Sequence, residues 1–244
     1  MNTLTAIYDE KGVEVLPEES RWADGVTNCG AQSGRNNTIN LVKRALADGV
    51  VGDFGECGVL SGCHPALMAW TLMRYGIKGR KVHLYDSFNG HPMAGPGDGP
   101  DEQRFLGVNP DVRHAIPTPN RQYACKGSRW QVETNMKWLH IDTSLLVYHE
   151  GYLQDLLPAE AAQNALPTFA VLRVDVDLHV STLPVVEYLY PRVSPGGYVI
   201  CDDWGESGPT PARRAWLDGF KRMGLAEPKW TSIPVTVGTV WWKK

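Results

Sequence analysis

The sequence of 244 residues has no long hydrophobic run and no N-terminal targeting segment. No window approaches the roughly 18 to 20 consecutive apolar residues that a membrane-spanning helix needs. Residues 1–20 have neither a basic start nor an apolar stretch, so they do not match a secretory signal peptide. We therefore expect a cytoplasmic protein that does not bind membranes.

Cysteine is scarce and irregularly spaced. None of the cysteines forms a C-x-x-C pair, which argues against a zinc site. An odd, scattered set in a chain without a signal peptide favours reduced thiols. The five cysteines are Cys29, Cys57, Cys63, Cys125 and Cys201.

The chain also lacks a strong excess of charge of either sign. Its formal net charge at pH 7 is −3 and it has no basic run, so we expect no nucleic-acid partner. The hydrophobic fraction of 43% and the charged fraction of 21% are ordinary for a globular protein. The length fits one large α/β domain or two small ones.

What the sequence does contain is a regular alternation of strand and helix patterns. Such an alternation indicates right-handed βαβ units, and therefore a mostly parallel sheet with helices on both faces. In sheets of this kind, ligands bind beyond the carboxyl ends of the strands. Hydrophobic periodicity predicts helices at 36–48, 65–76, 130–139, 151–157, 181–191 and 210–223, and strands at 50–59, 81–88, 145–149, 169–174, 197–201 and 235–244.

Two segments do not fit this alternation. Residues 89–130 hold six prolines and six glycines and show little periodicity, which is typical of a mobile lid rather than a plain connection. Residues 1–35 form an N-terminal extension that could also cover the site, before a domain at 36–244. Three tryptophans could stack on a sugar or an aromatic aglycone or simply pack: Trp22, Trp130 and Trp204.

Acidic residues stand where two predicted strands end. The stretch "VLRVDVDLHVST" runs from apolar residues into Asp175, and "GGYVICDDWG" ends on Asp202 and Asp203. Converging carboxylates repel one another unless a cation lies between them, and Mg²⁺ prefers oxygen ligands. We predict a magnesium site from these three residues and place Asp177 outside the ligand set. The alternative, for any single aspartate, is a helix cap.

A glycine-containing turn follows the first strand, in the form Glu56-x-Gly58-x-x-x-Gly62. This spacing differs from the G-x-G-x-x-G of dinucleotide sites, which argues against a phosphate cradle. The second strand ends at Asp86, where a carboxylate can accept hydrogen bonds from both ribose hydroxyls. Asp86 could equally cap a helix, with Ser87 as a rival for that role. Together the two motifs favour an adenosyl ligand without phosphates, and S-adenosylmethionine fits.

With these motifs the sequence resembles the macrocin O-methyltransferase family, whose members are metal-dependent, use S-adenosylmethionine and methylate sugar hydroxyls of natural products. The resemblance covers residue 28 to the C-terminus. Its motifs occur in the family's order and at its spacings. The matching stretches are "ADGVVGDFGECGVLSG" (47–62), "DSFNGHP" (86–92), "HEGYLQDLLP" (149–158), "LRVDVDLHVST" (172–182), "LYPRVSPGGYVICDDWG" (189–205) and "GTVWWKK" (238–244).

This resemblance implies a Rossmann-like class I methyltransferase fold with a seven-stranded sheet. It implies Mg²⁺ on Asp175, Asp202 and Asp203, a glycosylated small-molecule acceptor, and a homo-oligomer. A catechol-like diol is an alternative acceptor, and a non-catalytic adenosyl-binding scaffold is the alternative from another class. The candidate cofactor-binding residues all lie in the matching motifs: Glu56, Gly58, Ser61, Gly62, Asp86, Ser87, Gly151, Tyr152 and Asp175.

Methyl transfer also needs a group that takes the proton of the acceptor hydroxyl. Asp175 and His179 are the two candidates for this base. The sequence departs from the family's pattern at three places: Asn89 replaces a Glu, "VLSGC" (59–63) replaces "VWRGG", and His179-Val180 replaces a Tyr-Glu pair. Because the third change follows the acidic motif, we expect an acceptor that differs from the family's usual sugars. His64 could face the cofactor or cap a helix.

Overall fold

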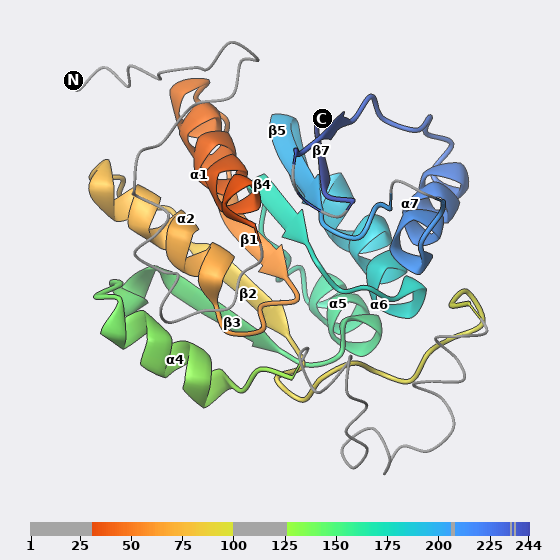
Figure 1. Ribbon diagram of the computed structural model, residues 1–244, viewed down its shortest axis with the longest axis horizontal. Helices are drawn as coiled ribbons and strands as arrows, with labels where there is room; N and C mark the ends of the chain where they lie inside the picture. The colour runs from red at the N-terminus through yellow and green to blue at the C-terminus, as the bar shows by residue number, and fades with distance from the viewer. Residues whose placement is uncertain (1–30, 100–125, 206–207, 235, 237) are drawn as a thin grey trace.

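The structure is a computed structural model that describes residues 31–99, 126–205, 208–234, 236 and 238–244. Within these residues, one seven-stranded sheet has the order β3-β2-β1-β4-β5-β7-β6 (Figure 1). The prediction of a mostly parallel sheet is confirmed, because among the described strands only β7 runs antiparallel to its neighbours, β5 and β6. The strands are β1 (Asp53–Cys57), β2 (Val82–Asp86), β3 (Leu146–Glu150), β4 (Phe169–Val174), β5 (Val193–Cys201), β6 (Thr231–Ser232) and β7 (Val240–Lys243).

Helices cover both faces of the sheet, as the alternating pattern predicted. Side chains of α1, α2 and α4 pack into one apolar core on one face, and those of α5, of the turn at Val185–Leu189 and of α7 pack into a second core on the other. Burial of these apolar side chains is the main force that holds the layers together. The helices are α1 (Gln32–Ala47), α2 (Cys63–Arg74), α4 (Arg129–Trp138), α5 (Leu153–Ala162), α6 (His179–Pro184) and α7 (Pro211–Arg222).

The register of the central strands determines where the functional residues emerge. Cys57 of β1 lies beside Val174 of β4, and Val174 lies beside Cys201 of β5. The next residue along each strand is therefore Gly58, Asp175 or Asp202, and all three leave the sheet at the same edge. A parallel arrangement brings together side chains that are more than one hundred residues apart in the sequence.

Several predicted boundaries are wrong. Helix α1 begins at Gln32, before the predicted start at residue 36. The predicted helix at 181–191 is α6 followed by a π-helical turn at Val185–Leu189 and a 3₁₀ turn at Tyr190–Arg192. Pro184, which has no N–H to donate, stands where the regular helix ends. The final strand is shorter than predicted, and the two-residue strand β6 was not predicted.

The cysteines agree with the prediction of reduced thiols only in part. Cys57 and Cys201 are free and buried in the core. Cys63, at the first position of α2, is disulfide-bonded, so the prediction is wrong for this residue. Cys29 and Cys125 lie outside the described residues. Among the helices that are described, none is both long and apolar enough to cross a membrane.

Candidate functional site

The turn that follows β1 requires glycine at its first position. Gly58 has a φ of +84°, and a Cβ atom there would overlap the carbonyl oxygen of Asp175 at the end of β4. Gly62, with a φ of +90°, ends the turn and precedes the first residue of α2. The two strand ends can therefore approach closely only because residue 58 has no side chain.

Asp86, at the end of β2, fastens this turn to the neighbouring strand. Its Oδ2 atom accepts hydrogen bonds from the backbone N–H groups of Val59, at 2.6 Å, and Leu60, at 3.2 Å. Its Oδ1 atom accepts one from Phe88 at 2.8 Å. Burial raises the pKa of Asp86, and the three N–H groups oppose that rise. No helix begins among residues 87–99, so Asp86 closes a turn rather than capping a helix.

A pocket opens at the carboxyl edge between β1, β2, β3 and β4. Its lining includes six of the predicted cofactor-binding residues, and it contains no Lys or Arg among the described positions. Carboxylates without basic residues suit a cationic sulfonium and do not suit a phosphate-bearing cofactor. Glu56, Ser61 and Gly62 do not line this pocket. The six that do are Gly58, Asp86, Ser87, Gly151, Tyr152 and Asp175.

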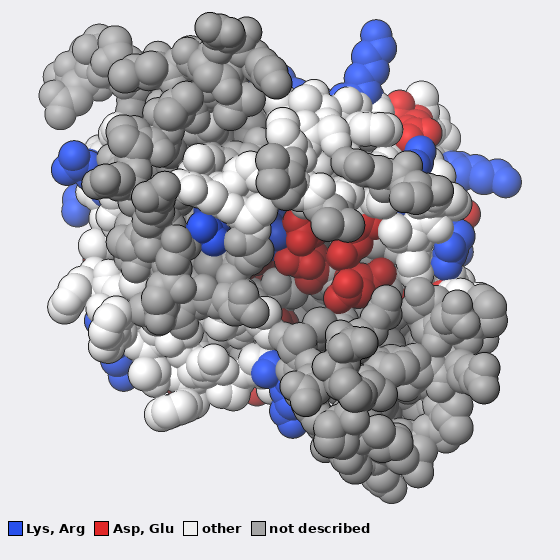
Figure 2. Space-filling view, in the orientation of Figure 1, with Lys and Arg blue, Asp and Glu red and all other residues white. Residues whose placement is uncertain are grey.

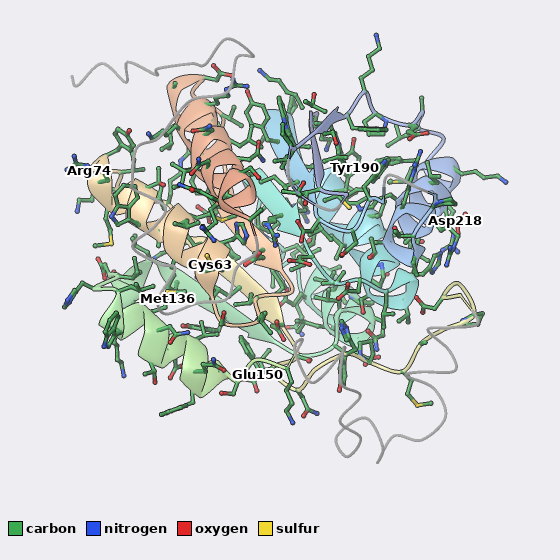
Figure 3. The ribbon with its side chains drawn as sticks, viewed as in Figure 1. Cys63, Arg74, Met136, Glu150, Tyr190 and Asp218 are labelled. Atoms are coloured by element: carbon green, nitrogen blue, oxygen red, sulfur yellow. The ribbon has the colours of Figure 1, made fainter. Side chains whose placement is uncertain are left out.

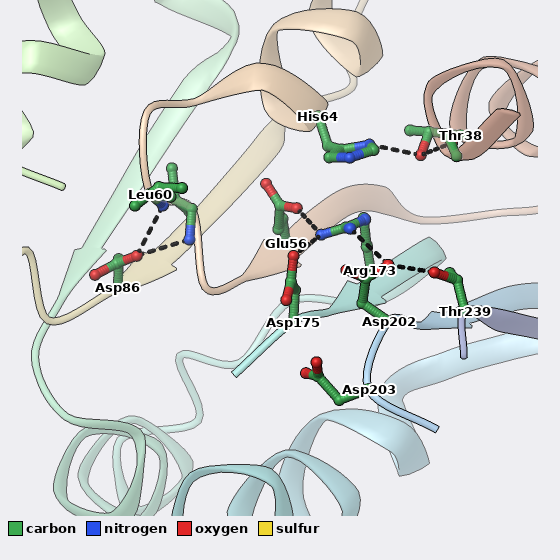
Figure 4. A network of polar contacts seen from close by, with 12 residues as sticks. Thr38, Glu56, Leu60, His64, Asp86, Arg173, Asp175, Asp202, Asp203 and Thr239 are labelled. Atoms are coloured by element: carbon green, nitrogen blue, oxygen red, sulfur yellow. Dashed lines mark hydrogen bonds and ion pairs between the residues drawn. The ribbon is translucent and has the colours of Figure 1, made fainter. Parts of the chain in front are cut away.

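Glu56 instead belongs to a buried ionic cluster around Arg173 (Figure 4). The Nη1 atom of Arg173 lies 2.5 Å from Glu56 Oε1 and 2.8 Å from Asp175 Oδ2. Its Nη2 atom lies 3.1 Å from Asp202 Oδ1. Arg173 was not predicted as a site residue, although a charged residue inside the apolar run "AVLRV" indicates a buried ionic contact. Arg173 thus connects β1, β4 and β5 below the site.

Asp175, Asp202 and Asp203 come together as predicted. They are the one group of three acidic, His or Cys side chains within the described residues whose ligand atoms all lie within 4.8 Å of one another. Acidic side chains gather in a hollow on this face of the molecule (Figure 2). Neighbouring groups orient them: Thr239 Oγ1 donates to Asp202 Oδ1 at 2.6 Å, and the Asp177 N–H donates to Asp203 Oδ2 at 2.9 Å. The oxygen donors fit Mg²⁺.

The electrostatics of this cluster favour a bound cation. Burial raises the pKa of Asp175 to about 7, against the attraction of Arg173, and the charges of Asp202 and Asp177 raise it further. Burial also raises the pKa of Asp203 well above its usual range, and the neighbouring aspartates add to the shift. A divalent cation would remove the repulsion that raises both values.

We expect Mg²⁺ to stabilise the protein more at about pH 8 than at about pH 6. Because the pKa of Asp175 is about 7 in the folded protein and about 3.9 in an unfolded chain, this group makes the metal-free protein less stable as pH rises between those values. Mg²⁺ binds the ionised carboxylates and offsets that loss. Thermal unfolding with and without millimolar Mg²⁺ measures the effect, and an equal or larger shift at the lower pH would contradict it.

His179, one of the two predicted bases, lies against a different set of residues. Its backbone N–H donates to Asp98 Oδ1 at 2.6 Å, and its Nε2 atom lies 3.0 Å from Asp218 Oδ2 on α7. Figure 3 places Asp218 at the outer side of α7. The imidazole ring packs on Gly97, and His179 is not among the residues that line the pocket. Its assignment as the base therefore has no support from this geometry.

Of the remaining predicted aromatic and histidine residues, Trp204 and His64 are buried. Trp204 is fully buried and lies 5.7 Å from Trp242, ring centre to ring centre. Trp130 is 74% exposed on α4, and Trp22 lies outside the described residues. His64 is buried, with its Nδ1 atom 2.8 Å from Thr38 Oγ1, and burial lowers its pKa.

Comparison with known proteins yields matches over most of the chain. A sequence model described as Macrocin-O-methyltransferase (TylF) matches residues 23–244. The chain is 31% identical over 197 residues to the 8-demethyl-8-(2,3-dimethoxy-alpha-L-rhamnosyl)-tetracenomycin-C 4'-O-methyltransferase of Streptomyces olivaceus, covering 79% of this chain and 67% of that protein. It is 31% identical over 170 residues to the mycinamicin III 3''-O-methyltransferase of Micromonospora griseorubida, covering 69% and 61%.

Two solved structures of methyltransferases are also similar in fold to this chain. The structure of the O-methyltransferase NovP superposes with a TM-score of 0.71 at 26% identity, covering 87% of this chain and 79% of that one. The calicheamicin methyltransferase CalS11 has a TM-score of 0.60 at 18% identity, covering 98% and 95%, and so shares the fold. The chain spans between 58% and 67% of the length of the curated relatives that it matches.

Proposed function

Since the chain belongs to the macrocin O-methyltransferase family, we propose that it transfers the methyl group of S-adenosylmethionine to a sugar hydroxyl of a glycosylated natural product. One observation carries this proposal: the pocket with Asp86 on its wall shares Asp175 with a cluster of three carboxylates. Adenosyl binding and metal binding would thus meet at one residue. The name of one relative, which specifies O-methyl transfer on a rhamnosyl tetracenomycin C, supports the substrate class.

The transfer is an in-line displacement in which the C–S bond breaks and a C–O bond forms. The acceptor oxygen must lie about 3 Å from the methyl carbon, on the side opposite sulfur. The glycine at position 58 keeps the β1 turn against the Asp175 backbone, and Asp86 holds that turn in place. These contacts would give the methyl donor and the acceptor fixed positions before the reaction.

Asp175, Asp202 and Asp203 are the residues that would hold Mg²⁺. When bound, the ion supplies a Lewis acid that lowers the pKa of a sugar hydroxyl and fixes its position. Arg173 holds two of these carboxylates in place from below, through contacts at 2.8 Å to Asp175 and 3.1 Å to Asp202. The Asp177 N–H holds the third, Asp203, at 2.9 Å, so contacts within the protein position all three carboxylates without the ion.

We expect Asp86→Ala to weaken S-adenosylmethionine binding by about 10- to 100-fold, because hydrogen bonds to a charged group contribute about 1.5–3 kcal/mol. Isothermal titration calorimetry with S-adenosylmethionine, with and without Mg²⁺, measures the change. The matched control is Asp142→Ala, which alters an exposed aspartate near the start of β3. Absence of binding by the wild type under every condition would overturn the proposed function and favour the scaffold alternative.

The acceptor is tested with the compounds that the relatives' names specify: the rhamnosyl tetracenomycin C, mycinamicin III and demethyldecarbamoylnovobiocin. Catechol serves as a non-sugar diol. Methylation of a glycosylated compound in preference to catechol supports the proposal, and the reverse preference supports the diol alternative. A homo-oligomeric state and a cytoplasmic location remain predictions.

A further inference from the structure

The pocket has two walls that come from separate parts of the chain. Four of its lining residues lie within 87–92, in the segment that follows β2, and three lie within 176–181, from the end of β4 into α6. The first wall belongs to a stretch, residues 87–99, that contains no helix or strand. Such a stretch lacks the regular backbone hydrogen bonds of a helix or sheet, so contacts with its neighbours determine where it lies.

Asp98 provides a buried contact between this stretch and the second wall. It is 3% exposed, and its Oδ1 atom accepts a hydrogen bond from the backbone N–H of His179 at 2.6 Å. His179 stands between Asp177 and Ser181, two of the residues that line the pocket. The Asp98 carboxylate therefore ties the stretch after β2 to the main chain of the second wall.

The same carboxylate also closes a turn within its own stretch. Its Oδ2 atom accepts a hydrogen bond from the Gly95 N–H at 2.7 Å, and the Asp98 N–H donates to the Gly95 carbonyl oxygen at 3.0 Å. A Cβ atom on Gly95 would lie 3.3 Å from the Cβ of Val180, and one on Gly97 would overlap the imidazole ring of His179. This turn thus packs directly against α6.

A second contact between the two walls is more exposed. The Nε2 atom of His91 lies 3.3 Å from Oδ2 of Asp177, whose side chain is 49% exposed. Contacts between exposed charged groups contribute little, whereas a buried hydrogen bond to a carboxylate is stronger. Of these two contacts, the one made by Asp98 is therefore the one that holds the first wall in place.

The main chain around position 98 requires a carboxylate there. Each oxygen of Asp98 accepts one backbone N–H, that of His179 or that of Gly95. An asparagine side chain has almost the same size, but it offers one acceptor oxygen and an NH₂ group that only donates. With asparagine at this position, one of the two backbone N–H groups would face another donor at hydrogen-bond distance. The substitution thus weakens the contact without opening a cavity.

We propose that Asp98 is a positioning residue for methyl transfer, which fixes the distance between the two walls of the S-adenosylmethionine pocket. The inference rests on the proposed function. With the Asp98 contact formed, His91 and Pro92 would lie against the bound cofactor. Without it, only a fraction of the molecules would have a complete pocket at any moment. The apparent affinity for S-adenosylmethionine would then fall by that fraction, while complexes that do form would react at the normal rate.

Asp98→Asn is expected to raise the KM for S-adenosylmethionine by about 10-fold, with kcat at saturating cofactor within about threefold of the wild type. Steady-state kinetics with the best acceptor of the panel above measures both constants, and calorimetry should show a similar loss of affinity. Asp142→Asn is the matched control, because Asp142 Oδ1 also accepts a backbone N–H, that of Ser144 at 3.0 Å, away from the pocket. Its KM should not change.

Position 179 offers a test that leaves Asp98 unchanged. His179→Ala and His179→Pro both remove the imidazole ring, but only proline removes the N–H that Asp98 accepts. Proline suits the first position of a helix, and the preceding Leu178, with a ψ of 146°, has the extended backbone that proline requires. The KM for S-adenosylmethionine should therefore be about 10-fold higher in His179→Pro than in His179→Ala.

Two results would overturn the inference and leave the proposed function intact. One is an unchanged KM in Asp98→Asn, including the case in which kcat alone falls, because Asp98 would then only stabilise its loop. The other, which decides the matter if Asp98→Asn does not fold, is an equal KM in His179→Pro and His179→Ala. Failure of the proposed function looks different: the wild type itself would neither bind S-adenosylmethionine nor methylate any member of the panel.

Discussion

Asp175→Asn is expected to lower methyl transfer by about 10³-fold, which corresponds to about 4 kcal/mol of lost transition-state stabilisation. The substitution keeps the shape of the side chain and removes one of three charges that would hold Mg²⁺. It also weakens the contact with Arg173. Turnover at saturating S-adenosylmethionine and Mg²⁺ measures the loss, and calorimetry with Mg²⁺ alone should show weaker metal binding.

Asp142→Asn, which alters an exposed aspartate near the start of β3, serves as the control for this loss and should retain full turnover. S-adenosylmethionine binding without Mg²⁺ should weaken less in Asp175→Asn than in Asp86→Ala, because the Asp86 wall of the pocket is unaltered. Near-normal turnover of Asp175→Asn would show that this residue is neither a metal ligand nor essential to the transfer.

Arg173→Met is expected to destabilise the fold by about 3–5 kcal/mol, because removing one partner of a buried ion pair leaves the other charge uncompensated. Glu56, whose side chain is 2% exposed, would lose the guanidinium that lies 2.5 Å away. Burial already raises the pKa of Glu56 well above its usual range, and Arg173 opposes that shift. Urea unfolding followed by circular dichroism measures the stability change.

A second substitution tests the cause of that loss. Glu56→Gln in the Arg173→Met background removes the uncompensated charge, so the double variant should recover a substantial part of the lost stability. If Arg173→Met is too unstable to purify, Arg173→Lys keeps the positive charge and should fold with a smaller loss. Stability of Arg173→Met within about 1 kcal/mol of the wild type would contradict the role assigned to this cluster.

The acidic cluster could be predicted from the sequence because its geometry follows from the strand pattern. Apolar runs that end in Asp175 and in Asp202-Asp203 define two neighbouring parallel strands, and parallel strands end at one edge. The glycine at position 58 could also be predicted, because the sequence shows a glycine-containing turn after the first strand. Asp86, whose carboxylate could have been a helix cap, required the structure to show that it fastens the turn after β1.

His91 and Arg173 could not be found in the same way. His91, which lines the pocket with its Nε2 atom 3.3 Å from Asp177 Oδ2, stands in a glycine- and proline-rich stretch without periodicity. Arg173 lies opposite Glu56 on the neighbouring strand, and a single sequence does not show which strands pair or in which register. His179 was proposed as a base because it is close to Asp175 in the sequence. The sequence does not show that its ring turns toward Asp218 on α7.

The assembly of the site from β1, β4 and β5 has a consequence for the order of folding events. Glu56 and Arg173 are 117 residues apart, and such non-local pairings form slowly because the intervening chain must first be closed into a loop. A growing chain cannot form the metal cluster until β5, which precedes Asp202 and Asp203, has joined the sheet. A ligand that binds only the completed cluster stabilises the native state by mass action, and it does so mainly by slowing unfolding, since the contacts it uses form late.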